Sequence, residues 1–81
     1  MAPHNRCVKQ EHKRIKQILV KNLKKFRAKL NLTQEQAAER VGVAYKYWQR
    51  LEMDSQADLP SLPIIFKMAE ALKVEVSQLL E

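Results

Sequence analysis

The sequence predicts an all-α fold of five helices in one small domain. Apolar residues recur at helical spacing along most of the chain, capping residues separate the apolar stretches, and no useful stretch alternates as a strand does. The 81 residues suffice for one domain and leave no room for a separate ligand-sensing domain. A domain of this size buries only about 60% of its unfolded surface, so its stability depends on efficient helix packing.

The first helix is clear from residue 15 onward. Its apolar residues step by three or four along one stripe: Ile15, Leu19, Leu23, Phe26 and Leu30. Asn31 tolerates a left-handed conformation and is expected to end the helix. Residues 1–14 carry no firm pattern, so they form either a flexible arm or further turns of this helix. We therefore divide the chain into a basic N-terminal extension, residues 1–17, and a helical domain, residues 18–81.

Two short helices follow, separated by the only glycine of the chain. Thr33 is expected to cap the first of them, with Gln36 completing a capping box. Leu32 and Ala37 occupy the positions of a hydrophobic staple. Gly42 stands where that helix must end in a left-handed residue.

The second short helix begins after Val43 and has two different faces. Trp48 and Leu51 continue the apolar pattern and are expected in the core. The opposite face is polar and consists of Tyr45, Lys46, Gln49 and Arg50. Such a pair of helices projects the second one as a rod that fits the major groove of DNA. The alternative is an ordinary helical hairpin whose polar face is merely solvated.

A polar connection, residues 53–60, leads to a fourth helix. Ser61 is its expected N-cap, and Pro63 lies in the first turn, where the missing N–H costs little. Its expected apolar face consists of Leu62, Ile65, Phe66, Ala69 and Leu72. A short fifth helix carries Val76, Leu79 and Leu80 after Val74.

Charge is distributed unevenly along the chain. The net charge is +6, but residues 1–30 contain ten Lys and Arg against Glu11 alone, which is +9. Residues 31–81 contain five Lys and Arg against eight acids, which is −3. A positive end of this kind suits a polyanion such as nucleic acid, although a solubilising helix face has the same composition.

The composition argues against several other classes of protein. One cysteine excludes an intramolecular disulfide framework and suits the reducing cytoplasm, and no signal peptide or membrane span is evident. No catalytic spacing or P-loop, dinucleotide or zinc-protease motif is present, so we expect no enzyme and no cofactor. His4, Cys7 and His12 fall short of a closed tetrahedral zinc site, so we expect no metal.

The order and spacing of these elements resemble the helix-turn-helix family of phage lambda repressor and Cro, the xenobiotic-response-element family. The resemblance covers residues 18–80 and rests on LTQEQAA at 32–38, VGV at 41–43, YWQRLE at 47–52, PSL at 60–62, KMAEALKV at 67–74 and VSQLL at 76–80. It implies the five-helix DNA-binding fold of that family, with the third helix in the major groove.

The resemblance also implies which residues contact DNA. Tyr45, Lys46 and Arg50 are the expected base readers, with Gln49 a weaker candidate. Thr33 and Gln34 are expected to contact phosphate through backbone N–H groups and the Gln34 amide. The Tyr47 hydroxyl either reaches phosphate or belongs to a half-buried packing residue.

Arg27 and Glu52 match a buried ion pair that ties the family's first helix to the end of its third. Other positions depart from the family pattern. Ala44 stands where the recognition helix usually has a Ser or Thr cap, Lys73 where Gly is usual, and Glu75 where Ser is usual. The loop at 53–60 is about two residues longer than usual and carries Asp54 and Asp58 where relatives offer cations.

The sequence thus predicts a sequence-specific double-stranded DNA-binding transcriptional regulator, a repressor by analogy, acting as a homodimer. Lys13 and Lys16 are expected to add phosphate contacts from the basic extension. Val74, Val76, Leu79 and Leu80 are expected either at the dimer surface or closing the monomer core. The main alternative is a protein-binding module such as the antitoxin of a toxin–antitoxin pair. A third is non-specific binding of nucleic acid or an anionic surface.

Overall fold

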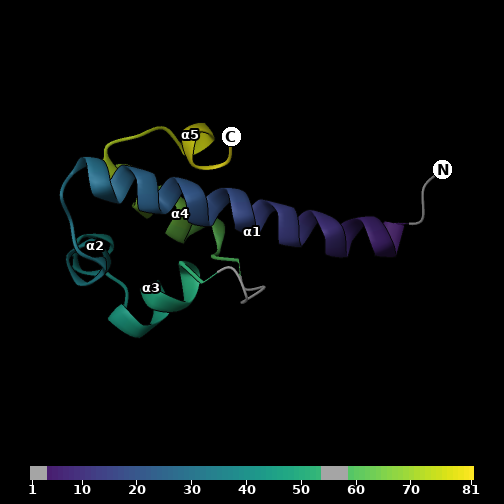
Figure 1. Ribbon diagram of the computed structural model, residues 1–81, viewed down its shortest axis with the longest axis horizontal. Helices are drawn as coiled ribbons and strands as arrows, with labels where there is room; N and C mark the ends of the chain where they lie inside the picture. The colour runs from purple at the N-terminus through teal and green to yellow at the C-terminus, as the bar shows by residue number, and fades with distance from the viewer. Residues whose placement is uncertain (1–3, 54–58) are drawn as a thin grey trace.

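The structure is a computed structural model that describes residues 4–53 and 59–81, with side chains from residue 11 onward. Its helices are α1 (His4–Lys29), α2 (Gln34–Val41), α3 (Tyr45–Leu51), α4 (Leu62–Leu72) and α5 (Val76–Leu79). No strand occurs in the part of the chain described, so the predicted all-α class with five helices is confirmed. In Figure 1, α1 runs along the molecule, with α2 and α3 on one side of it and α5 on the other.

Helix α1 crosses the expected boundary at residue 17 without interruption. It has 26 residues, which corresponds to a length of about 39 Å, and its N-terminal end projects beyond the other helices (Figure 1). Leu19, Leu23 and Phe26 of the apolar stripe are buried, as predicted. Asn31 follows the helix with φ 56°, the left-handed conformation expected of it. Residues from position 4 onward therefore belong to the first helix rather than to an arm.

The predicted caps of α2 are confirmed. The Gln36 N–H donates to Thr33 Oγ1 at 3.1 Å, and the Thr33 N–H donates to Gln36 Oε1 at 2.9 Å. Gly42 ends the helix with φ 89°, and its N–H donates to the Ala38 carbonyl at 2.8 Å. The next helix has no such support at its start, since Ala44 makes no side-chain capping bond. These local signals fix where α2 begins and ends.

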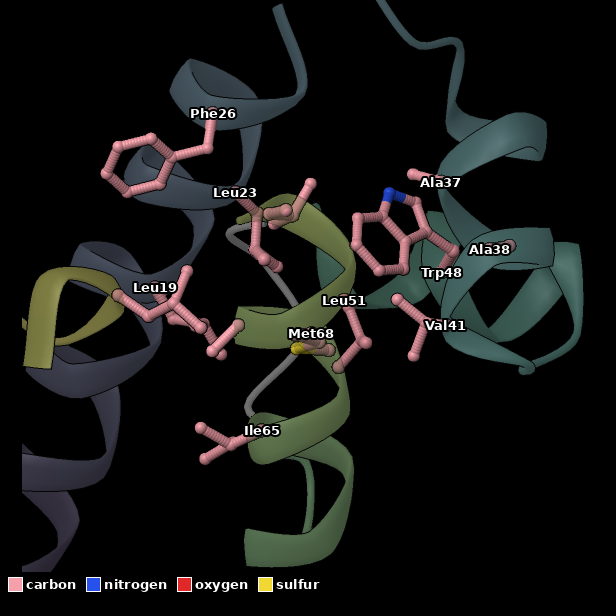
Figure 2. Packing of buried hydrophobic residues seen from close by; sticks show 13 residues of the cluster. Leu19, Leu23, Phe26, Ala37, Ala38, Val41, Trp48, Leu51, Ile65 and Met68 are labelled. Carbon is pink, nitrogen blue, oxygen red and sulfur yellow. The ribbon is translucent and has the colours of Figure 1, made fainter. Parts of the chain in front are cut away.

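The core is one cluster of buried side chains to which all five helices contribute. The Trp48 side chain is fully buried and faces α1 and α4 across the cluster (Figure 2). Ala37 and Ala38 are small and buried, so α2 packs close to its neighbours. The buried cluster consists of Leu19, Leu23, Phe26, Ala37, Ala38, Val41, Trp48, Leu51, Ile65, Met68, Ala69, Leu72 and Leu79.

The predicted apolar face of α4 was partly wrong. Leu62 is 66% exposed and Phe66 60% exposed, whereas Met68 is fully buried. The buried residues, Ile65, Met68, Ala69 and Leu72, follow the i, i+3, i+4, i+7 spacing of one face. Leu62 and Phe66 lie beside that face, and their side chains are left largely uncovered. Ser61 is the N-cap by position but makes no side-chain bond.

Hydrogen bonds from a side chain of α1 hold the C-terminal helix α5. Asn22 is buried, and its Nδ2 donates to the carbonyls of Leu79 at 2.8 Å and Glu81 at 3.3 Å. Leu79 is fully buried in the core and is therefore not a surface residue. Leu80 is 40% exposed, whereas Val74 and Val76 are partly buried against the core. A four-residue helix has little stability of its own, so these contacts hold it in place.

Candidate nucleic-acid interface

Helix α3 presents one buried and one exposed face. Trp48 and Leu51 are buried, whereas Tyr45, Lys46 and Arg50 are exposed. Lys46 and Arg50 are four residues apart and therefore point to the same side of the helix. The predicted base-reading face is thus a surface of the molecule, and α3 contributes no acidic side chain to it.

The other two residues of α3 in the expected site are less exposed to solvent. Gln49 and Tyr47 are half-buried, which suits the weaker role given to Gln49 and the packing alternative given to Tyr47. Tyr47 and Arg50 each also interact with another group of the protein. A ligand that engages either side chain therefore competes with an existing interaction.

The start of α2 lies exposed, but some of its donors are already used. The Thr33 N–H, expected to face phosphate, donates instead to Gln36 Oε1 in the capping box. The N–H groups of Gln34 and Glu35 lie in the first turn, where a helix offers them no acceptor. The Gln34 amide donates to Glu52 Oε1 at 2.9 Å and has a second hydrogen on the same nitrogen. The available donors at this end are therefore those of Gln34 and Glu35.

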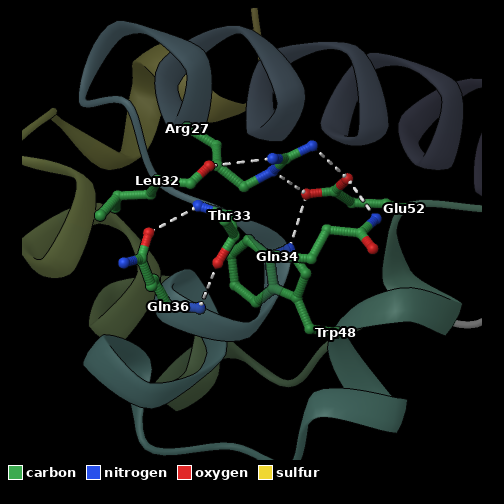
Figure 3. Close-up of polar contacts among 7 residues, drawn as sticks. All are labelled: Arg27, Leu32, Thr33, Gln34, Gln36, Trp48 and Glu52. Carbon is green, nitrogen blue, oxygen red and sulfur yellow. Dashed lines mark hydrogen bonds and ion pairs between the residues drawn. The ribbon is translucent and has the colours of Figure 1, made fainter.

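The expected ion pair between Arg27 and Glu52 is present and forms the centre of a larger network. Arg27 Nε lies 2.9 Å from Glu52 Oε2, and Arg27 Nη2 lies 3.1 Å from Oε1 (Figure 3). The indole N–H of Trp48 donates to Oε2 at 2.6 Å, and Arg27 Nη1 donates to the Leu32 carbonyl at 3.0 Å. With Gln34, the buried carboxylate accepts hydrogen bonds from α1, α2 and α3. It fixes these three helices relative to one another.

Lys16 is buried in the protein, unlike the neighbouring cations of α1. Its side chain is buried, with the residue 1% exposed, and Nζ donates to the Arg50 carbonyl at 3.2 Å. The expectation that Lys16 contacts phosphate was therefore wrong, because its ammonium group faces the end of α3. The available signal was its spacing, since Lys16 lies three residues before Leu19 and seven before Leu23 on the core side.

The other cations of α1 form a broad exposed surface. Among the side chains that the structure describes, the exposed ones are Lys13, Arg14, Lys21, Lys24, Lys25 and Lys29. Lys25 and Lys29 place Nζ 5.2 Å and 5.6 Å from the centroid of the Phe26 ring. Glu11 reaches Arg14 at only 4.0 Å, and both side chains are largely exposed. Lys13 lies three residues before Lys16 and so projects from the same side of α1, toward α3.

Some expectations fall on residues that the structure does not describe. Asp54 and Asp58, the acidic residues of the long loop, lie outside the described residues, as do the side chains of His4 and Cys7. Among described residues, no group of three or more His, Cys, Asp or Glu side chains is placed to hold a metal ion. None of the helices, over the part of the chain described, combines the length and apolar character that crossing a bilayer requires.

Comparison with known proteins identifies a family whose model matches most of the chain. A family model described as helix-turn-helix matches residues 23–79, from the second half of α1 to the end of α5. No curated protein and no solved structure gives a significant match. The matched segment includes all seven expected contact residues and the Arg27–Glu52 pair, and it leaves Lys16 and Asn22 outside.

Proposed function

Because the chain belongs to the helix-turn-helix family of lambda repressor and Cro, whose members are DNA-binding transcription regulators, we propose that it represses transcription by binding a specific duplex sequence. The observation that carries this proposal is the exposed cationic face of α3, with Lys46 and Arg50 on one side and Trp48 and Leu51 buried behind them. A helix held in this way by its apolar side is free to enter a groove with its polar side.

In this proposal α3 lies in the major groove, which is about 12 Å wide and admits one α-helix. Lys46 and Arg50 suit the O6 and N7 acceptors of guanine, which is the commonest base contact of these side chains. Tyr45, at the start of the helix, contacts the adjoining base pair. Gln49 is half-buried and reaches the base edges less readily.

Phosphate contacts come from the start of α2 and from α1. The N–H groups of Gln34 and Glu35 lie at the positive end of the α2 dipole, and the second amide hydrogen of Gln34 extends this donor set. Thr33 and Tyr47 add hydroxyl groups that can bond to phosphate oxygens. Lys13 contributes a charge from α1, on the side of that helix that faces α3.

A homodimer completes the site, because one seven-residue helix reaches few base pairs. Two copies on a two-fold operator would place their α3 helices about 34 Å apart, one turn of DNA. The side chains that suit this contact are the exposed apolar residues of α4 and of the segment just after α5, which are Leu62, Phe66 and Leu80. Phe66, Val74 and Val76 line a surface hollow of about 400 Å³ together with the charged residues Lys67, Glu70 and Glu75. A side chain of the second copy would pack into this hollow.

Selection from a random duplex library tests the proposal. We expect enrichment of a short palindrome whose half-sites are centred about 10 base pairs apart. A library that yields no enriched sequence, with binding that depends on salt alone, would reject sequence-specific regulation.

The second candidate is a protein-binding module such as an antitoxin. The observation that favours it is the exposure of Leu62 and Phe66, which suit a partner protein as well as a second copy. It predicts a monomer with no measurable duplex binding near physiological salt. The genes beside the coding sequence offer a further test, since a neighbouring toxin would favour this candidate.

A further inference from the structure

Helix α3 is held unequally at its two ends. At its start, Ala44 provides no side-chain cap. At its end, Lys16 donates to the Arg50 carbonyl at 3.2 Å, and two nitrogens of Arg27 donate hydrogen bonds to the Glu52 carboxylate. A helix of seven residues has little intrinsic stability, so tertiary contacts of this kind set its position.

The two α1 side chains approach the end of α3 from opposite directions. Lys16 and Arg27 are eleven residues apart, which places their Cα atoms about 16 Å apart along α1 and nearly on the same side of it. Both side chains nevertheless end on residues 50–52, only two positions apart. Two long cationic side chains of α1, from positions about 16 Å apart, therefore both bind the end of α3.

We propose that Lys16 is a positioning residue for DNA recognition, which fixes the end of α3 by binding the main chain of the base-reading residue Arg50. This inference rests on the proposed function. The Lys16 ammonium group makes a charge-assisted hydrogen bond to a carbonyl at the negative end of the α3 dipole. Because Arg50 has a long side chain, a small rotation of its main chain displaces the guanidinium by a larger distance. Holding that carbonyl therefore holds the guanidinium in register with a base.

This role gives the N-terminal extension a function inside the folded domain. Lys16 precedes the segment matched by the helix-turn-helix family, which begins at residue 23. It is 1% exposed, so it is not placed to meet a phosphate. Lys13, one turn earlier on the same helix, is exposed and makes the matched comparison.

The test compares Lys16→Met with two controls. Lys13→Met removes the same charge from an exposed site. Leu79→Ala opens the core in α5, away from α3, and controls for loss of stability alone. All variants are compared at a temperature at which circular dichroism shows them folded.

The first measurement needs no DNA. We expect Lys16→Met to speed amide hydrogen exchange at Glu52 and Met53 about tenfold more than in α5. These N–H groups donate to the carbonyls of Trp48 and Arg50. Lys13→Met should leave exchange unchanged, and Leu79→Ala should speed it in α5 at least as much as in α3. If Lys16→Met speeds exchange uniformly over the molecule, the positioning role is refuted, whether or not the protein binds DNA.

The second measurement is base preference on the selected operator. We expect Lys16→Met to reduce discrimination about fivefold at the base pair that Arg50→Ala also affects, with the salt dependence of binding unchanged. Lys13→Met should lower the slope of log K against log salt by about 1 and leave preference intact. If Lys16→Met instead lowers the salt slope as Lys13→Met does, Lys16 contacts phosphate and the inference is wrong.

If Lys16→Met does not fold, the proposal is tested with Lys16→Arg instead. It retains a charged donor on a longer side chain, so the end of α3 must shift to accommodate it. We expect the amide chemical shifts of residues 50–53 to move more than those of α4 and α5. Shifts that stay unchanged at residues 50–53 would overturn the proposal.

Discussion

Arg27 and Glu52 are joined by two hydrogen bonds, of 2.9 Å and 3.1 Å, that tie the first helix to the end of the third. The Glu52 side chain is 1% exposed and that of Arg27 21% exposed. The carboxylate also accepts from Gln34 and Trp48, so its charge is dispersed over donors from three helices. Desolvation of the carboxylate is costly, and these donors together offset it.

Replacing Arg27 with Met should therefore destabilise the domain strongly. The substitution leaves a buried carboxylate with neutral donors only, which costs about 3 kcal/mol or more of unfolding free energy. Urea denaturation measures this change. Arg14→Met is the matched control, because its pair with Glu11 is long and exposed and contributes little. Equal losses in the two variants would mean that burial of Glu52 does not determine the effect.

Lys46→Ala and Arg50→Ala should each relax base preference at a different position of the operator. Loss of a good bidentate contact to guanine costs about 1–3 kcal/mol of discrimination. Competition binding with operators changed one base pair at a time measures it. Lys67→Ala, an exposed cation of α4, serves as the control. If all three variants weaken every sequence alike, binding is non-specific.

Lys13→Ala should weaken binding to every duplex by the same factor. Its charge lies on α1 rather than on the base-reading face, so it is expected to act on the phosphates. Titrations at several salt concentrations should show a slope of log K against log salt that is smaller by about 1. An unchanged slope would place the basic surface of α1 away from the DNA.

Gly42→Ala should destabilise the turn between α2 and α3. The left-handed conformation, with φ 89°, costs a residue that has a Cβ about 1–2 kcal/mol. A Cβ at this position meets no atom within 4 Å, so crowding adds nothing. Gly42→Asn should cost less, because Asn tolerates this region better. Urea denaturation of both variants checks the order, and an equal or larger loss for Asn would contradict it.

Phe66→Lys should dissociate the proposed homodimer without unfolding the monomer. Phe66 is 60% exposed, so placing a charge there costs the isolated chain little. Sedimentation velocity should show a monomer where the unchanged protein is a dimer, with a similar thermal transition at low concentration. Glu39→Lys, at an exposed position of α2 outside this hollow, tests whether any added charge has this effect. A wild-type protein that sediments as a monomer would remove the dimer from the proposal.

Local chemistry predicted the boundaries of α2 well. Thr33, Gln36 and Gly42 act through bonds and dihedral angles within one turn, so their roles follow from residue type and spacing. Asn31 and the buried Trp48 were predicted for the same reason. The Arg27–Glu52 pair joins distant residues, and it was predicted only because the chain resembles a known family.

The sequence by itself thus determined the five helices, the caps of α2 and the polar face of α3, because each depends on neighbours three or four residues away. Only the tertiary structure decided which side chains have a neighbour to pack against. It exposed Leu62 and Phe66, buried Leu79, and turned Lys16 from an expected phosphate contact into a support for Arg50. The physical reason is that helical periodicity specifies a face, whereas burial at the edge of that face depends on where the next helix lies.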